Sequence, residues 1–107
     1  MFGFNQNNFI SDVVIESDLA TVAIDTTTGI VHRWDCTQDV TVNFSGDGLF
    51  TVLSITLTGI LPKTITFGTN VHSTTSTFAM TAGRKHSLTF AYDGVEHILV
   101  GSQLTLL

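Results

Sequence analysis

Four histidines are the residues of this 107-residue chain whose type is best suited to metal binding or proton transfer. They are His32, His72, His86 and His97, and they show no HxH or HxxxH spacing. No pair of them lies beside a carboxylate in a metal-ligand pattern, whereas zinc sites usually have short ligand spacings. The sequence leaves open that they converge in space. We predict no metal site and interpret them as ordinary turn and surface histidines.

Cys36 is the one cysteine, so it has no partner for an intrachain disulfide. A catalytic thiol needs a histidine and an activating environment. His32 lies four residues earlier, a spacing that brings side chains together on a helix but not in an extended segment. We therefore expect Cys36 to be a buried, small apolar residue.

Two further segments could bind a ligand. Residues 45–48, Ser-Gly-Asp-Gly, resemble part of a calcium loop but lack its later oxygen ligands and closing Glu, so we predict a tight hairpin connection. Trp34 is the one tryptophan, and alternation places it with His32 on one face of an extended segment. A core or interface position and a sugar-stacking role both remain open for Trp34.

No motif in the chain points to catalysis. The sequence contains no nucleophile elbow, phosphate loop or paired-carboxylate motif. We therefore predict no catalytic residues, no cofactor and no enzymatic activity.

Hydrophobic alternation predicts the elements that position these residues. Apolar side chains recur at every second position in five segments, with Thr, Ser or Asn dominating between them, and this period of two is typical of β-strands. The segments are residues 40–45, 53–58, 64–68, 77–81 and 87–92. Residues 12–24 combine helical and strand spacing, and their β-branched content favours strands, with at most one helical turn near residues 16–18.

Turn sequences separate these runs at regular intervals. The sharpest is Asp93-Gly94, which predicts a two-residue type I′ hairpin pairing Phe90 with His97. We predict an all-β fold, a compact antiparallel β-sandwich or barrel of about eight to ten short strands with this C-terminal hairpin.

The first ten residues differ from the rest of the chain. Phe2, Phe4 and Phe9 stand among glycine and a polar run of Asn and Gln. Three exposed phenylalanines are costly in water. We predict an N-terminal arm over residues 1–10 that docks on a neighbouring chain, followed by a single β domain over residues 11–107; a frayed terminus is the alternative.

Composition excludes several classes of protein. Only 12% of the residues are charged, against roughly a quarter in ordinary domains, and threonine is the commonest residue, with 18 copies. A net charge of −5 with four basic residues excludes a nucleic-acid module. The N-terminus does not read as a signal peptide, and no apolar run is long enough for a bilayer. We expect synthesis in the cytoplasm and no membrane partner.

From Val42 onward the chain resembles a β-rich domain of tailed-bacteriophage virion proteins, which include head-decoration proteins, head fibres and tail fibres. The similarity rests on residues 57–59 (Leu-Thr-Gly), residues 63–70 (KTITFGTN) and residues 88–94 (LTFAYDG), followed by a strand and Gly101-Ser102. His97 departs from the pattern, because the family often has Trp after the hairpin. The resemblance covers about 60 residues and concerns strands and turns.

This resemblance implies a non-enzymatic structural protein on the capsid surface of a virion. The first expectation is a decoration, or cement, protein that binds the major capsid protein as a homotrimer and stabilises the phage head, with Phe2, Phe4 and Phe9 in contact with partners. The alternative is a head- or tail-fibre module that binds a host receptor or glycan, with Trp34 and Tyr92 as stacking residues. The low charge supports assembly independently, because charge is depleted in buried interface cores.

Overall fold

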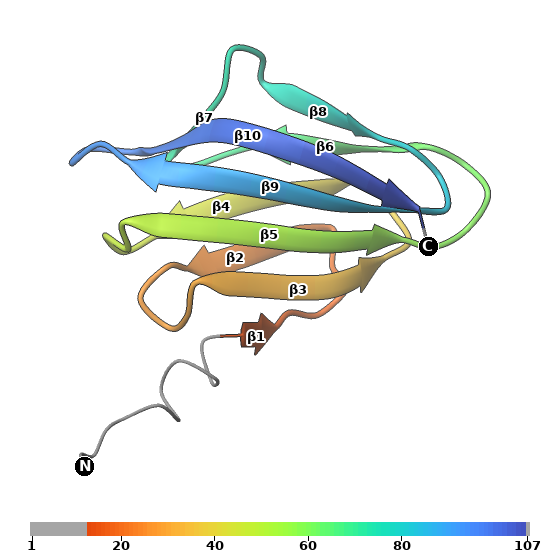
Figure 1. Ribbon diagram of the computed structural model, residues 1–107, viewed down its shortest axis with the longest axis horizontal. Helices are drawn as coiled ribbons and strands as arrows, with labels where there is room; N and C mark the ends of the chain where they lie inside the picture. The colour runs from red at the N-terminus through yellow and green to blue at the C-terminus, as the bar shows by residue number, and fades with distance from the viewer. Residues whose placement is uncertain (1–12, 107) are drawn as a thin grey trace.

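The computed structural model describes residues 13–106, which form ten β-strands and no helix (Figure 1). The all-β prediction is therefore confirmed for this part of the chain. The strands are β1 (Val13–Ile15), β2 (Thr21–Asp25), β3 (Val31–Cys36), β4 (Val40–Ser45), β5 (Phe50–Leu57), β6 (Lys63–Phe67), β7 (Val71–His72), β8 (Thr77–Met80), β9 (Arg84–Tyr92) and β10 (His97–Leu106).

The strands form two mixed sheets that face each other across a common core (Figure 1). The six-stranded sheet, here called sheet A, has the order β1-β3-β5-β9-β10-β7. The four-stranded sheet, sheet B, has the order β2-β4-β6-β8. From β1 to β9 each strand lies in the sheet opposite to the strand before it. The chain thus winds around the core.

This winding makes the first part of each sheet parallel, contrary to the antiparallel prediction. β1, β3 and β5 run parallel in sheet A, and β2, β4 and β6 run parallel in sheet B. Antiparallel pairing occurs where β5 meets β9, β9 meets β10 and β6 meets β8. Alternation has a period of two in either direction, so it does not distinguish the two arrangements.

A C-terminal hairpin joins β9 to β10, as predicted, but its loop contains four residues rather than two. His97 pairs with Tyr92, and Leu99 pairs with Phe90, so the predicted Phe90–His97 pair is wrong. The amide of Asp93 donates to the carbonyl of Glu96 at 3.1 Å. Gly94 has φ +99°, whereas Asp93 does not have a positive φ. A type I′ turn needs positive φ at both central positions, so Asp93-Gly94 does not form the predicted type I′ turn.

The core is formed by the inward positions of both sheets. The completely buried side chains include Ile24, Leu53, Ile55, Leu57 and Phe90. In β2 the buried residues alternate with exposed ones, and in β4 they alternate with half-buried ones, as the sequence pattern predicts. The ring of Phe90 packs edge-on against Phe44 and Phe67, with centroids 4.9 and 5.9 Å apart, and so joins the two sheets.

The segment with mixed spacing contains β1 and β2 and, within the described residues 13–24, no helical turn. The β-branched content therefore indicated the correct structure, as expected for residues that suit a pleated surface. The predicted arm of residues 1–10, including Phe2, Phe4 and Phe9, lies outside the described residues. The boundary between the arm and the β domain stays a prediction.

Candidate binding surface

The outer face of sheet A carries a group of apolar side chains at one end. Val13, Val31 and Val52 lie in register across β1, β3 and β5, and Phe50, Ala91 and Ile98 lie in register across β5, β9 and β10. Their neighbours along β5 and β9, Thr51, Leu53 and Phe90, point into the core. We call these six outward residues the apolar end.

Several side chains of the apolar end are open to solvent. Phe50 is 60% exposed and Val13 is 44% exposed, while Val31, Val52 and Ile98 are half-buried. Val100, also 60% exposed, follows Ile98 at a register shift in β10. Large apolar side chains grouped on one sheet face are typical of a surface that binds another protein.

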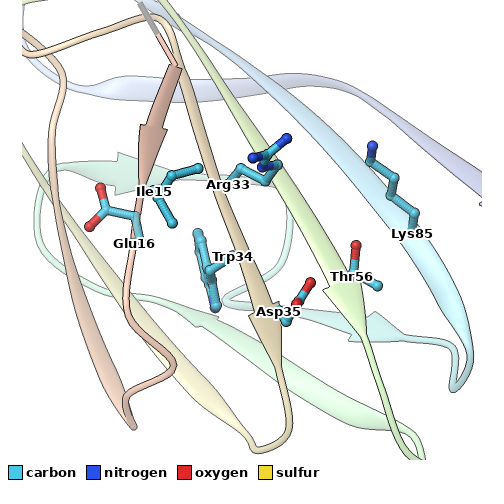
Figure 2. Close-up of a pocket in the computed structure, with 7 residues that line it drawn as sticks. All are labelled: Ile15, Glu16, Arg33, Trp34, Asp35, Thr56 and Lys85. Carbon is cyan, nitrogen blue, oxygen red and sulfur yellow. The ribbon is translucent and has the colours of Figure 1, made fainter.

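The other end of this face carries charges around a shallow hollow of about 500 Å³ (Figure 2). Its lining residues are Ile15, Glu16, Arg33, Trp34, Asp35, Thr56 and Lys85. Arg33 and Asp35 are alternate residues of β3, and Thr56 of β5 pairs with Lys85 of β9. In the described part of the chain, neither Arg33 nor Lys85 forms an ion pair. The hollow therefore presents two of the four basic side chains to a polar partner.

Glu16 also lines this hollow, but its carboxylate points away from Arg33 and Asp35 (Figure 2). Its Oε2 lies 2.7 Å from Nδ1 of the completely buried His32, and Nε2 of His32 lies 3.0 Å from the carbonyl oxygen of Gly29. Both nitrogens of the imidazole thus have a partner. This arrangement attaches the end of β1 to the core and is structural in character.

The interpretation of the histidines as turn and surface residues is wrong for three of them. His32, His86 and His97 are buried, and His72 alone is exposed. Nε2 of His97 donates to the carbonyl oxygen of Gly46, in the connection between β4 and β5, at 3.0 Å. Nε2 of His86 lies within hydrogen-bond distance of the backbone of Thr81. These hydrogen bonds offset part of the cost of burying the polar rings, while Nδ1 of His97 is buried without a partner in the described residues.

The buried histidines do not form a metal centre with one another. In residues 13–106, no group of three or more His, Cys, Asp or Glu side chains could hold a metal ion. The same residues contain no helix long and apolar enough to cross a bilayer.

Cys36 is completely buried at the end of β3, as the sequence analysis expected. Its Sγ donates to the carbonyl oxygen of Gln38 at 3.0 Å. Burial raises the pKa of the thiol, because the thiolate would lose its hydration. The protonated form is therefore favoured at neutral pH, and the thiol is not activated.

The two candidates for sugar stacking are both turned inward. Trp34 is 2% exposed and packs in the core, so its ring does not offer a face to a sugar in solution. Tyr92 is half-buried, and its ring lies against that of His97 with centroids 4.7 Å apart. One face of the Tyr92 ring is thus already covered.

Residues 45–48 comprise the end of β4 and most of its connection to β5, and these strands lie in opposite sheets, so the predicted hairpin connection is wrong. Gly46 has φ +83°, a left-handed backbone conformation that glycine adopts readily. The amide of Gly48 donates to Oγ1 of Thr26 at 3.0 Å. The segment is a turn held by a hydrogen bond to the connection between β2 and β3.

The apolar end is the feature that the sequence analysis missed. A signal for it exists in residues 50–53, Phe-Thr-Val-Leu, where apolar side chains occupy both alternating sets of positions. Such a strand has an apolar side chain on each face and needs cover on both.

Comparison of the chain with protein-family models, with curated proteins and with solved structures gives no match.

Proposed function

We propose that this chain is a non-enzymatic structural protein of a phage virion, and that it binds other protein chains through the outer face of sheet A. The single observation that supports this proposal best is the apolar end, where Phe50 is 60% exposed on the outer face of sheet A. A side chain of this kind is stabilised when a partner covers it.

The low charge of the outward positions supports the same proposal. In sheet B the outward side chains include Thr21, Ala23, Thr66 and Thr77, all exposed and uncharged. Removing charged groups from water is costly, so surfaces that become interface cores carry few of them. We interpret the architecture as a β-sandwich whose faces suit packing in an assembly.

The resemblance of residues 42–102 to virion domains makes the proposal more specific. In this proposal the chain is a capsid decoration protein that binds the major capsid protein, as a homotrimer, on the surface of the phage head. The charged hollow would lie at the rim of the interface, where Arg33 and Lys85 meet acidic groups of the partner. The predicted arm, with Phe2, Phe4 and Phe9, would strengthen the attachment.

Two measurements test this proposal. Light scattering gives the mass of the purified full chain, and sedimentation with expanded, DNA-free heads of the phage that encodes it gives binding. We expect oligomers or stoichiometric binding, together with a higher melting temperature of the heads. A stable monomer that does not bind heads would contradict the proposal, and binding to a glycan array instead would favour a fibre module.

A matched pair of variants locates the interface. Phe50→Ser, at the apolar end, should weaken binding to heads or self-association by about tenfold or more, as at a central interface residue. Val95→Ser is the control, because Val95 is 77% exposed in the loop between β9 and β10. Equal losses of binding in the two variants would show that the outer face of sheet A is not part of the interface.

A further inference from the structure

The edge of sheet A at β10 is paired over only part of its length. β10 pairs with β9 from His97 to Leu106, but with β7 only at His97 and Ile98. In the part of the chain that the structure describes, residues 101–106 therefore have no strand on the side away from β9. They follow the register shift in β10 and are regular to the end of the strand. We call residues 101–106 the open stretch.

Backbone groups of the open stretch are directed towards solvent. The amide of Tyr92 donates to the carbonyl oxygen of Leu49, on the side of β9 away from β10. Successive residues of an antiparallel strand direct their backbone groups to alternate sides, so every second residue of β9 before Tyr92 also faces away from β10. The partners of these residues in the open stretch are Ser102, Leu104 and Leu106. Their N–H and C=O groups therefore face away from β9, where an added strand can bond to them.

Side chains of the open stretch are uncovered as well. Ser102 and Leu104 lie opposite Leu88 and His86, which are buried, so all four lie on the core face of sheet A. Ser102 and Leu104 are nevertheless exposed, Leu104 by 51%. The core face of sheet A is thus covered along β9 but not along this part of β10. A strand added here would cover Leu104 together with the backbone edge.

The charge of this edge favours a second copy of the chain as its partner. Residues 98–106 contain no ionisable side chain and no proline, which are the usual means of keeping edge strands apart. The net charge of −5 makes two copies repel each other, and the repulsion is least where a surface carries no acidic group. The other edge strands are shorter than the open stretch: β2, β8, β1 and β7 have five, four, three and two residues.

We propose that two copies of this chain pair through the open stretch of β10, antiparallel to each other, about a two-fold axis at Leu104. Leu104 then lies opposite the partner's Leu104, and Ser102 lies opposite the partner's Leu106. This register uses every outward-directed backbone group of the open stretch in both copies and brings the two exposed leucines together. Because the same surface is used on both sides, the contact closes at two copies.

The pairing goes beyond the virion role and does not depend on it. For the free protein it predicts a dimer, whereas the resemblance to virion domains implies a homotrimer. The mass in solution therefore separates this proposal from that part of the proposed function.

Amide hydrogen exchange of the full chain, measured by NMR and combined with light scattering, tests the pairing. We expect a mass of two copies and a Ser102 amide that exchanges at least about tenfold more slowly than in Leu104→Lys. This substitution places like charges opposite each other in the pair, and it should give a monomer. The amide of Gln103 faces β9 and should stay protected in both proteins, which shows that β10 remains folded. Leu19→Lys is the matched control, because Leu19 is 54% exposed in the connection between β1 and β2.

The possible results separate the alternatives. Slow exchange of Ser102 in a dimer that Leu104→Lys dissociates and Leu19→Lys leaves intact supports the proposal. Fast exchange of Ser102 overturns it at any mass, because the edge is then unpaired. Slow exchange in a monomer overturns it as well, since the cover would come from the same chain, and slow exchange in a trimer excludes a two-fold pair. None of these results decides whether the protein binds phage heads, which sedimentation measures separately.

Discussion

Nδ1 of His32 lies 2.7 Å from Oε2 of Glu16, and this contact joins the residue after β1 to the interior of sheet A. Nε2 of His32 donates to the carbonyl oxygen of Gly29 at 3.0 Å. His32 is completely buried and both nitrogens of its imidazole have a partner, so loss of the contact with Glu16 should lower the stability of the fold.

Removing the carboxylate should destabilise the protein. Glu16→Ala leaves Nδ1 of the completely buried His32 without its partner, which should lower the free energy of unfolding by about 1–3 kcal/mol. Urea unfolding at pH 7 measures the change. The control is Glu96→Ala, which removes a 3.4 Å contact to the exposed His72 and should cost less than about 1 kcal/mol. Equal losses in both variants would show that burial of the His32 pair adds nothing.

Asp18 should make the fold sensitive to acid. Its carboxylate accepts from Oγ1 of Thr37 at 2.6 Å and from Nε2 of Gln38 at 3.2 Å, which fixes the β1–β2 connection to the β3–β4 turn. The hydroxyl of Thr37 is the main cause that lowers the pKa of Asp18. A carboxyl group with a lowered pKa in the folded state stabilises it above the unfolded pKa, and this contribution is lost as the pH falls through the folded pKa.

The comparison of Asp18→Asn with the wild type from pH 6 to about pH 2 measures this contribution. We expect Asp18→Asn to be less stable at pH 6 and to lose less stability on acidification, because the carboxyl group whose pKa is lowered in the folded state is gone. Asp47→Asn, in the exposed β4–β5 loop, is the control for the change from Asp to Asn. A wild-type acid response in Asp18→Asn would mean that the hydrogen bonds of Asp18 do not stabilise the folded state.

Local patterns predicted the strands better than they predicted the path of the chain. Alternation identified β4 and placed Trp34 on the same face as His32, which is the buried face, because the burial of alternate residues gives a period of two in the sequence. The parallel winding was not predictable in this way. The turns after Asp25 and Ser45 have the composition of hairpin turns, but they lead to the opposite sheet.

The burial of the histidines depends on contacts between distant residues. Glu16 lies 16 positions from His32, and Gly46 lies 51 positions from His97. No short sequence motif contains both members of such a pair. Sequence analysis therefore predicts a surface position for these histidines until the path of the chain is known. The apolar end was closer to being predictable, because Phe50 and Leu53 already point to opposite faces of one strand.

Cys36 should react with thiol reagents only after the protein unfolds. Its side chain is completely buried, and burial raises the pKa of its thiol. Because the thiolate is the reactive form, folding should slow labelling at pH 8 by a factor of 100 or more, an order of magnitude set by the opening equilibrium. The ratio of the labelling rates is measured by absorbance with a disulfide reagent, in buffer and in about 8 M urea, which unfolds the protein. Fast labelling of the folded protein would show that the end of β3 opens readily.

A side chain at Gly48 should destabilise the fold, because here the β4–β5 turn lies against the β2–β3 turn. A Cβ at this position would meet the carbonyl oxygen of Thr26, a backbone atom that cannot rotate away, in a contact much shorter than van der Waals distance. The same turn is held by the bond from the amide of Gly48 to Oγ1 of Thr26, which a shift of the loop would break. Gly48→Ala should therefore lower the free energy of unfolding by about 1–3 kcal/mol in a urea titration. Gly101→Ala is the matched control: its Cβ would meet nothing within 4 Å, and Ala suits a strand at least as well as Gly, so the change should be within about 0.5 kcal/mol. An unchanged free energy of unfolding in Gly48→Ala would mean that the β4–β5 turn moves freely relative to the β2–β3 turn. The close contact between the two turns would then contribute nothing to the stability of the fold.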